Sequence, residues 1–593
     1  AAGRMRVANG VVGQLQVLVN VHLTAVPHAA IAVLVAGEIL EDGVEHDNQF
    51  VHNLAILTKC HPDAPCVPTN LAPFGTTANG RNFLTDGQNA KDVLLPSDNT
   101  ASTFWITNPD NIYRDNVAAG SDSTGFWFAL PQNGIGKFEN TEIGTKTWPR
   151  RTKVKEFKGN IAHSNFDGFL LDRGPRPDGH FAVGGHTSLV NPANANGPQV
   201  ESVFEDFTSY KNRNGGMWNR GEMHVYKNLK LADNAIGYTH ASGSFGQSAF
   251  TSRVVDSLFV GETENIGNPS TPAEKAYGRS LPQPTLADFP IRAYEFYDYH
   301  HELDNVTFVN FQDNATRKTG ALSYLLFTSF GMSSNNTVQR AKFINAKPVY
   351  FPPMENKWSN DDYGSGSYKS SVFHDKDGSV GGVPNSFIVI NGGIALDDAC
   401  EIKPTWNAAV CKGDVGRMTV GGGGGPAGFG EVGPLGPGAP GGRGAAAGAG
   451  GVGGPGARGA AAGPGARGGR GGAAAAVPAQ PVVLSLNGKE FPDPGATNVR
   501  AGTEYKVTTE RPSLSLSVSE LDAGSWVMFE LKGFTTASSG TAQDSLDALR
   551  KATATSYYKG NGSLWVKLVS TGDILGSGPT QGPSGGASLQ ASR

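Results

Sequence analysis

The sequence predicts an all-β protein whose large N-terminal part is a right-handed parallel β-helix. Two observations lead to this fold class. Short runs of alternating apolar residues recur about every 22 residues, and each is followed by Asn or Asp at a bend with Gly close behind. No long run with the 3.6-residue period of a helix interrupts them. A third observation, a Gly-rich stretch over 421–479, predicts a linker to a second, smaller β module.

The clearest repeat joins FTSYKNRNGGMW to LKLADNAIGYTH. An offset of 22 residues places Asn212 on Asn234 and Gly215 on Gly237. Gly and Asn accept the left-handed backbone that a sharp turn requires, and inward Asn amides can bond to their neighbours in adjacent coils. Between the turns, β-branched and aromatic side chains are expected to fill the bore.

A second pair, VAAGSDSTGFWF and IAHSNFDGFLL, has the same pattern. Its glycines, Gly125 and Gly168, are 43 residues apart, which we interpret as two periods of the repeat.

The composition shifts divide the chain into five segments. In the last of the folded segments, VVLSLNGKEF, TEYKVTT, SLSLSVSEL and SWVMFELKGF alternate as strands of a small β-sandwich. The predicted segments are a separate N-terminal stretch that could add first coils (1–36), the β-helix (37–420), the Gly/Ala/Pro-rich flexible linker (421–479), the small β domain (480–575) and a disordered tail (576–593).

Charge and hydropathy exclude two classes of partner. Lys plus Arg number 49 against 53 for Asp plus Glu, so the net charge of −4 gives no attraction to nucleic acid or to an anionic membrane. The sequence contains no uninterrupted apolar run of about 18 residues, so no membrane insertion is expected. Only 17% of residues are charged and Gly numbers 80, a balance typical of secreted or cell-surface β proteins.

The four cysteines form two close pairs, Cys60/Cys66 and Cys400/Cys411. This even, local pairing favours two small disulfide loops in an oxidising compartment, and buried thiols are the alternative.

Long blocks of the chain resemble one known family. LEDGVEHDN, STFWITNPDNIYRDNVAAGS, HSNFDGFLLDRG, YKNRNGGMWNRG, LADNAIGYTHASGSF, SVFHDKDGSV and CEIKPTWNAAVC resemble, in the same order, the β-helical region of the cell-surface hyaluronidase and cell-migration-inducing hyaluronan-binding protein family, with fibrocystin-like proteins as distant relatives. The resemblance implies a secreted, pectate-lyase-like solenoid and calcium-dependent endo-cleavage of hyaluronan. The family's G8-type domain and earliest coils have no counterpart here, and a related acidic or amino-sugar polysaccharide is an equal candidate.

The stretch EILEDGVEHDN is the first candidate site. Carboxylates at an Asp-Gly bend can hold a hard cation or divide into an acid and an ionised partner for glycoside hydrolysis. We assign catalytic roles to Asp42, Glu45 and His46, which can carry a proton near neutral pH, and glycan binding to Asn48. The alternative is a solvated turn held by bonds from side chains to the backbone.

Three further groups are candidates. HSNFDG places His163, Asn165 and Asp167 at alternate positions, which predicts a sugar-contact row in which His163 is catalytic; an Asn-ladder turn is the alternative. SVFHDKDGSV places Asp375 and Asp377 at the spacing of calcium ligands, although it lacks the final Glu of an EF-hand, and a solvated turn is the alternative.

The last group combines an aromatic platform with a charge clamp. Trp218 could stack on a sugar and Arg220 could grip a uronate carboxylate, with His240 one coil later as a catalytic partner. Core packing is the alternative for Trp218.

These residues predict a polysaccharide depolymerase, with hydrolysis favoured by the resemblance and a lyase kept open. A glycan would lie along successive coils, and the acidic and imidazole groups are expected to line up on one outer wall. A glycan-binding or adhesion solenoid without turnover and a structural spacer are the alternatives.

Overall fold

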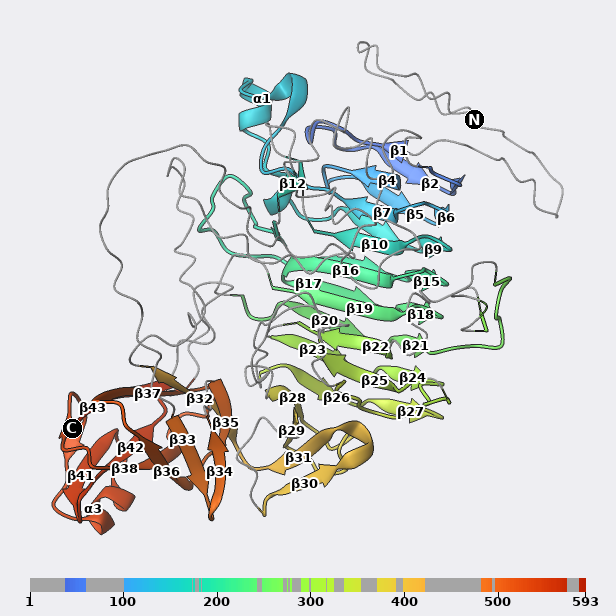
Figure 1. Cartoon of the computed structure of the whole chain (residues 1–593). Helices are drawn as coiled ribbons and strands as arrows, with labels where there is room; N and C mark the ends of the chain where they lie inside the picture. Colours follow the sequence, from blue (N-terminus) through green and yellow to red (C-terminus); the bar gives the residue numbers. More distant parts are fainter. Residues whose placement is uncertain are drawn as a thin grey trace, which may run out of the picture.

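The computed structural model describes residues 38–59, 101–172, 174–175, 181–182, 184–242, 248–269, 275, 278–279, 290–297, 300–315, 317–324, 335–352, 371–390, 398–421, 482–492, 496–572 and 586–593. Within these residues the chain forms a tall stack of parallel strands with a β-sandwich at its C-terminal end (Figure 1). The predicted β-helix is confirmed.

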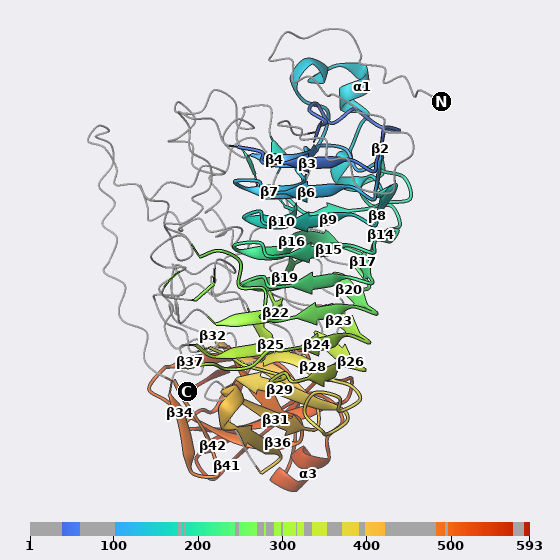
Figure 2. The ribbon, with the colours of Figure 1, turned by 90° about the vertical axis from the view of Figure 1, so that its right-hand side faces the viewer.

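Each coil of the β-helix passes through three parallel sheets, named A, B and C in chain order. The stacking of one sheet on the next coil is plain in Figure 2. Sheet A contains β1 (Glu38–Ile39), β4 (Ser102–Ile106), β7 (Thr124–Phe128), β10 (Asp167–Leu171), β16 (Gly215–Glu222), β19 (Ile236–Ala241), β22 (Ile291–Phe296) and β25 (Thr319–Tyr324), and β13 (His186–Thr187) pairs with the end of β16.

Sheets B and C are made of shorter strands. Sheet B contains β2 (Gln49–Val51), β5 (Ile112–Arg114), β8 (Glu156–Lys158), β14 (Ser202–Glu205), β17 (His224–Lys227), β20 (Ser252–Val255), β23 (His301–Asp304) and β26 (Thr337–Gln339). Sheet C contains β3 (Leu54–Ile56), β6 (Val117–Ala119), β9 (Ile161–His163), β15 (Thr208–Tyr210), β18 (Lys230–Ala232), β21 (Leu258–Val260), β24 (Thr307–Val309) and β27 (Lys342–Ile344).

The corners between sheets explain the Asn, Asp and Gly of the repeat. Where sheet B turns into sheet C, one residue per coil takes the left-handed conformation, as Asp206, Asn228 and Asp256 do with φ of 55°, 53° and 51°. Asn and Asp tolerate this conformation better than other residues with a side chain. A single such residue is therefore enough to redirect the chain.

Asparagine ladders brace all three corners from inside. Asn212 lies fully buried where sheet C turns into sheet A, and its Oδ1 accepts hydrogen bonds from the backbone N and Nδ2 of Asn165 at 3.1 and 3.2 Å. Its Nδ2 donates to Asn234 Oδ1 at 3.1 Å. The predicted pairing of Asn212 with Asn234 is confirmed. Similar ladders join Asn48 to Asn111 and join Asn53, Asn116 and Asn160.

The register in sheet A differs from the 22-residue repeat. Thr208 pairs with Lys230 in sheet C, an offset of 22, but Gly215 pairs with Ile236 and not with Gly237. The later coil has one residue fewer between its ladder asparagine and its sheet A strand. Because side chains alternate along a strand, this slip reverses which residues face inward.

The interpretation of Gly125 and Gly168 as two coils apart is wrong. Phe126 pairs directly with Phe169, so β7 and β10 lie in adjacent coils. The additional residues form an insertion between sheets A and B, residues 129–155, which includes η3 (Gly136–Phe138), α1 (Glu142–Thr145) and η4 (Pro149–Arg151). A second insertion, 172–201, leaves the same edge one coil later and includes β11 (Gly174–Pro175) and β12 (Phe181–Ala182).

Aromatic ladders fill the bore. Phe104 stacks on Phe126 at 4.4 Å between ring centroids, and Phe126, Phe157 and Phe207 meet edge to face or tilted. These rings belong to one continuous buried core that runs from Leu40 to Val410. Burial of this apolar surface is the main force that holds the coils together.

The last coil ends in an antiparallel sheet. The strands are β28 (Ser371–Asp375), β29 (Ser386–Ile390), β31 (Ala408–Lys412) and β30 (Cys400–Lys403), with η6 (Pro404–Trp406) between the last two in sequence. The predicted disulfide between Cys400 and Cys411 is present, whereas Cys60 and Cys66 lie outside the described residues.

The C-terminal module is a β-sandwich around its own buried core. Its boundaries differ from the prediction, because the strand Val415–Gly421 at the expected end of the β-helix and Gly586–Ser592 of the expected disordered tail both pair with β37. One sheet contains β35 (Ala496–Arg500), β32 (Val415–Gly421), β37 (Ser513–Ser519), β43 (Gly586–Ser592) and β39 (Thr536–Ala537). The other contains β34 (Lys489–Pro492), β33 (Val482–Leu486), β36 (Thr503–Thr509), β38 (Trp526–Lys532), β42 (Ser563–Val569), β41 (Ser556–Gly560) and β40 (Thr541–Ala542), with α3 (Leu546–Lys551) beside β41.

Among the described residues, no helix is both long and apolar enough to span a bilayer.

Candidate functional site

The EILEDGVEHDN motif forms the connection from sheet A to sheet B in the first described coil. After β1 the chain bends at Gly43, whose φ of +80° favours glycine, and a Cβ there would lie 2.7 Å from Pro131 Cγ. Val44 is buried beside it, whereas His46 and Asp47 are exposed. The motif is therefore a tight turn with one buried anchor.

The next coil fixes this turn from below. Thr107 Oγ1 accepts a hydrogen bond from Gly43 N at 3.1 Å and donates to Leu40 O at 2.9 Å. Asn108 Nδ2 donates to Gly43 O, and Asn111 Nδ2 donates to Glu45 O, both at 2.9 Å. These bonds pair the polar backbone groups of the turn, so its position depends on the register of two coils.

The 129–155 insertion covers the turn from the other side. Ile135 N donates to Asp42 O at 2.9 Å. Gly136, at φ +59°, lies so close to Asp42 Oδ1 that a Cβ there would collide with this oxygen. Side chain and insertion thus fit only because residue 136 is glycine.

Asp42 and Glu45 form a carboxyl pair in which the two groups differ. Burial, followed by the nearby charges of Glu45 and Glu41, raises the pKa of Asp42 to about 6. Glu45 Oε1 accepts hydrogen bonds from the backbone N of Asp42 at 2.9 Å and of Glu41 at 3.2 Å. Glu45 Oε2 is buried and has no hydrogen-bond partner within the described residues. An acid that keeps its proton near neutral pH thus stands beside an oriented carboxylate.

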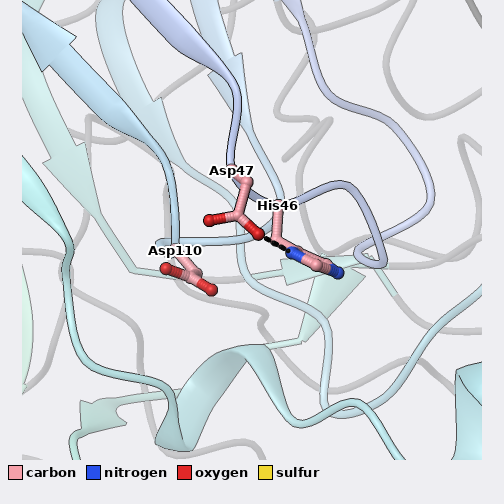
Figure 3. A group of neighbouring side chains, drawn as sticks. All are labelled: His46, Asp47 and Asp110. Atoms are coloured by element: carbon pink, nitrogen blue, oxygen red, sulfur yellow. Dashed lines mark hydrogen bonds and ion pairs between the residues drawn. The ribbon is translucent and has the colours of Figure 1, made fainter.

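His46, Asp47 and Asp110 bring three possible metal ligands within 4.8 Å of one another, as Figure 3 shows. His46 Nδ1 lies 2.7 Å from Asp47 Oδ2. Lys155 of the insertion already supplies a cation here: its Nζ forms an ion pair with Asp47 and lies 3.4 Å from Asp110 Oδ1. Its hydrogen bond lowers the pKa of Asp47. The ammonium group therefore neutralises the cluster.

The other predicted site residues do not join this turn. His163 lies in sheet C, half-buried, with its ring stacked on Tyr210 at 4.8 Å between centroids. Burial lowers its pKa. Because sheet C lies beyond sheet B along the coil, His163 faces a different wall from Asp42.

Asn165, Asp167 and Asn48 differ from the sugar contacts that we predicted. Asn165 is fully buried in the ladder described above, and Asp167 is 1% exposed, with its Oδ1 accepting a hydrogen bond from Gly215 N at 2.8 Å. Asn48 is exposed, but its Nδ2 donates to Asn111 Oδ1 at 3.0 Å. Corner geometry, not ligand binding, explains why asparagine recurs at these positions.

Trp218 is part of an outer apolar cluster and not an open platform. It is 6% exposed, and its Nε1 donates to Asp172 Oδ2 at 3.0 Å. Arg220 Nε donates to Asp172 Oδ1 at 3.1 Å, and the guanidinium lies over the Tyr297 ring. The clamp predicted for a uronate is therefore occupied by an internal carboxylate. Trp105, Trp127, Ala129, Phe166, Leu170, Ala241 and Tyr297 complete the cluster.

His240 faces the interior instead of the groove. It pairs with Asn219, which faces the bore, whereas Trp218 pairs with Thr239. The one-residue difference in register causes this reversal: at an offset of 22, His240 would have followed Trp218 on the outer face.

Asp375 and Asp377 brace a turn at the far end of the β-helix. Asp375 Oδ2 accepts from the backbone N of Val380 and Gly381, and Asp377 Oδ2 accepts from Arg340 N. In the described part of the chain, no third His, Cys, Asp or Glu joins them in a group that could hold a metal. They lie on the ninth strand of sheet B, about 38 Å from the first coil at about 4.8 Å per strand.

The expected alignment on one outer wall is thus wrong. Asp42, Glu45 and His46 share one turn, but His163 and His240 face other directions. Sequence spacing missed Lys155, because its contact with Asp47 depends on how the insertion folds back. It also missed the buried His186 and His224, for which only a strand pattern around each residue would have been a signal.

Comparison with known proteins confirms the resemblance. Residues 35–170 match the family described as CEMIP beta-helix, which includes the whole acidic turn and its insertion. The chain is 32% identical over 398 residues to a Dictyostelium discoideum protein without a functional name. It is 29% identical over 405 residues to human "Cell surface hyaluronidase CEMIP2" and over 406 residues to mouse "Cell migration-inducing and hyaluronan-binding protein". Each alignment covers 64% of this chain but only 35%, 28% and 29% of these relatives.

Proposed function

We propose, on the premise that residues 35–170 form a CEMIP-type β-helix, that the chain acts on an acidic or amino-sugar polysaccharide such as hyaluronan. The printed names of two relatives, a hyaluronidase and a hyaluronan-binding protein, support this substrate class. We further propose that the chain is an endo-acting glycoside hydrolase located at the cell surface or outside the cell. The disulfide at Cys400 and Cys411 supports an oxidising compartment.

The observation that carries the proposal is the raised pKa of Asp42 beside Glu45. Glycoside hydrolysis needs one protonated carboxyl group to donate a proton to the leaving oxygen and one carboxylate to act on the opposite side. At about 6, the pKa of Asp42 suits the proton donor near neutral pH. Glu45, oriented by two backbone N–H groups, is the matching carboxylate.

Calcium assistance, which the resemblance implies, has no support in these residues. The oxygens of Asp375 and Asp377 are engaged by backbone N–H groups, and the group around His46 already contains the Lys155 ammonium. We therefore route no catalytic step through a metal.

A glycan-binding solenoid without turnover is the second candidate. It is favoured by one observation, namely that the predicted catalytic imidazoles of His163 and His240 are not at the acidic turn. A glycan could then rest on the turn without being cut.

The two candidates are separated by incubating the full chain with hyaluronan, chondroitin, pectate and alginate, with calcium or with a chelator. Product size and the ultraviolet absorbance of unsaturated sugar ends are followed. Shorter chains without that absorbance support the hydrolase, and shorter chains with it indicate a lyase. Intact but retarded chains indicate a binder, and intact, unretarded chains contradict both proposals. Glu41→Gln, which changes an exposed neighbour in the same turn, is the matched control for Asp42→Asn.

A further inference from the structure

The bore of the β-helix contains a line of histidines among its aromatic residues. His186 of β13, His224 of β17, His240 of β19 and His301 of β23 are all fully buried, on the inner side of the edge where sheet A turns into sheet B. We call the first three, which are joined by hydrogen bonds, the histidine seam. Their ring centroids follow one another at 5.1 and 5.3 Å.

Hydrogen bonds order the seam from one end to the other. His186 Nε2 lies 2.7 Å from Thr152 O, His186 Nδ1 lies 2.8 Å from His224 Nε2, and His224 Nδ1 lies 3.1 Å from His240 Nε2. A carbonyl oxygen can only accept, so His186 must donate through Nε2 and, when neutral, accept through Nδ1. It follows that His224 and His240 also donate through Nε2. One tautomer of each ring satisfies the whole chain.

This arrangement works only while the rings are neutral. A proton added to Nδ1 of His186 or of His224 would set one N–H donor against another and break the bond between two rings. Burial lowers the pKa of His186 to about 4. Burial and the neighbouring imidazoles lower the pKa of His224 and His240 well below the usual value.

The groups packed around the seam do not compensate for an added charge. Arg220 of β16 further disfavours a proton on His240, and Tyr226 of β17 and Tyr238 of β19 contribute neutral hydroxyls. Glu222 of β16 is the nearest carboxylate along the chain, two residues before His224. None of the three seam rings is paired with a carboxylate within the residues that the structure describes. A charged seam would therefore be both desolvated and unpaired.

The first bond of the seam holds the 129–155 insertion. Thr152 belongs to this insertion, and the neighbouring Arg151 O accepts a hydrogen bond from Leu189 N at 2.9 Å. The same insertion carries Ile135 and Gly136, which cover the Asp42 turn. The seam thus connects the coil interior to the segment that shapes the candidate site.

We propose that the histidine seam is an acid-sensitive latch, which fastens the 129–155 insertion to the β-helix at neutral pH and releases it when the seam takes up protons. The latch is independent of the proposed hydrolase activity, because it concerns the fold and not the substrate.

The direction of the pH effect follows from linkage. An unfolded histidine binds a proton near pH 6.5, whereas the folded seam resists it. The stabilisation is therefore fully present above pH 6.5 and is lost as the pH falls. For His186 the loss continues to about pH 4, which corresponds to an approximately 300-fold decrease in the folding equilibrium constant.

The test combines urea unfolding of the full chain between pH 7.5 and about 4 with hydrogen exchange of the insertion at the same pH values. We compare wild type with His224→Phe, which keeps an aromatic ring but removes the central titrating group. His52→Gln, at a side chain that is 74% exposed, is the control. We expect the pH slope of stability to fall by about one proton in His224→Phe and to stay unchanged in the control, with faster exchange of 129–155 in wild type at acidic pH. An unchanged slope in His224→Phe, or exchange of 129–155 that does not change with pH beyond the intrinsic rate, would overturn the proposal.

If His224→Phe does not fold, imidazole ¹⁵N shifts of wild type decide the matter. Rings of the seam that remain neutral at pH 5 in the folded protein support the latch. Rings that titrate near pH 6.5 without loss of structure contradict it.

Discussion

Asn212→Ala is the sharpest test of the stacked coils. The asparagine is fully buried, and its side chain makes four hydrogen bonds: two accepted from Asn165 and two donated, to Asn234 Oδ1 at 3.1 Å and to Ser209 Oγ at 2.9 Å. At about 1 kcal/mol net for each bond, with the buried Asn165 N–H left unpaired, the substitution should cost about 3–5 kcal/mol.

The assay is urea unfolding of the β-helix followed by circular dichroism, with the free energy taken from the midpoint and slope. Asn228→Gly is the matched control, because Asn228 also sits in a coil corner but its side chain is exposed and glycine keeps its left-handed backbone. We expect the control to cost less than about 1 kcal/mol. A loss below about 1 kcal/mol in Asn212→Ala would show that the inner ladder does not hold the coils in register.

Further predictions concern the site and the ends of the β-helix. Gly136→Ala should displace the Asp42 carboxyl and reduce glycan cleavage while leaving the circular dichroism spectrum unchanged; full activity would contradict this contact. Since Asp42 must be protonated to act as an acid, cleavage should decline as the pH rises through about 6, and a rate that instead increases would assign it another role. Lys155→Ala should create weak binding of zinc, measurable by calorimetry, which wild type lacks. The double change Cys400→Ser and Cys411→Ser should lower stability by about 3 kcal/mol, and an unchanged melting temperature would exclude a stabilising role.

The sequence was most informative at the coil corners. Asn212 and Asn234 are paired as predicted because a left-handed turn and an inward amide each require a particular residue type, so the pattern is local. The acidic turn was also found, since the Asp-Gly bend is local too. Its partners on 129–155 were not, because an insertion folds back according to its own packing.

The orientation of side chains could not be predicted, because it depends on the register to a single residue. His240 was expected on the outer face with Trp218, but the shorter turn before Ile236 directs it into the bore. Trp218 itself is covered, and its partner Asp172 carries no motif. Strand pairing between distant coils, not the spacing of polar residues, therefore decides which groups can meet a substrate.

The most direct test of the central claim is the size of hyaluronan after incubation with wild type and with Asp42→Asn at equal folded concentration. The account predicts that wild type shortens the chains and that Asp42→Asn, with the Glu41→Gln control unimpaired, is slower by about 10²- to 10⁴-fold. Equal cleavage by wild type and Asp42→Asn would contradict it.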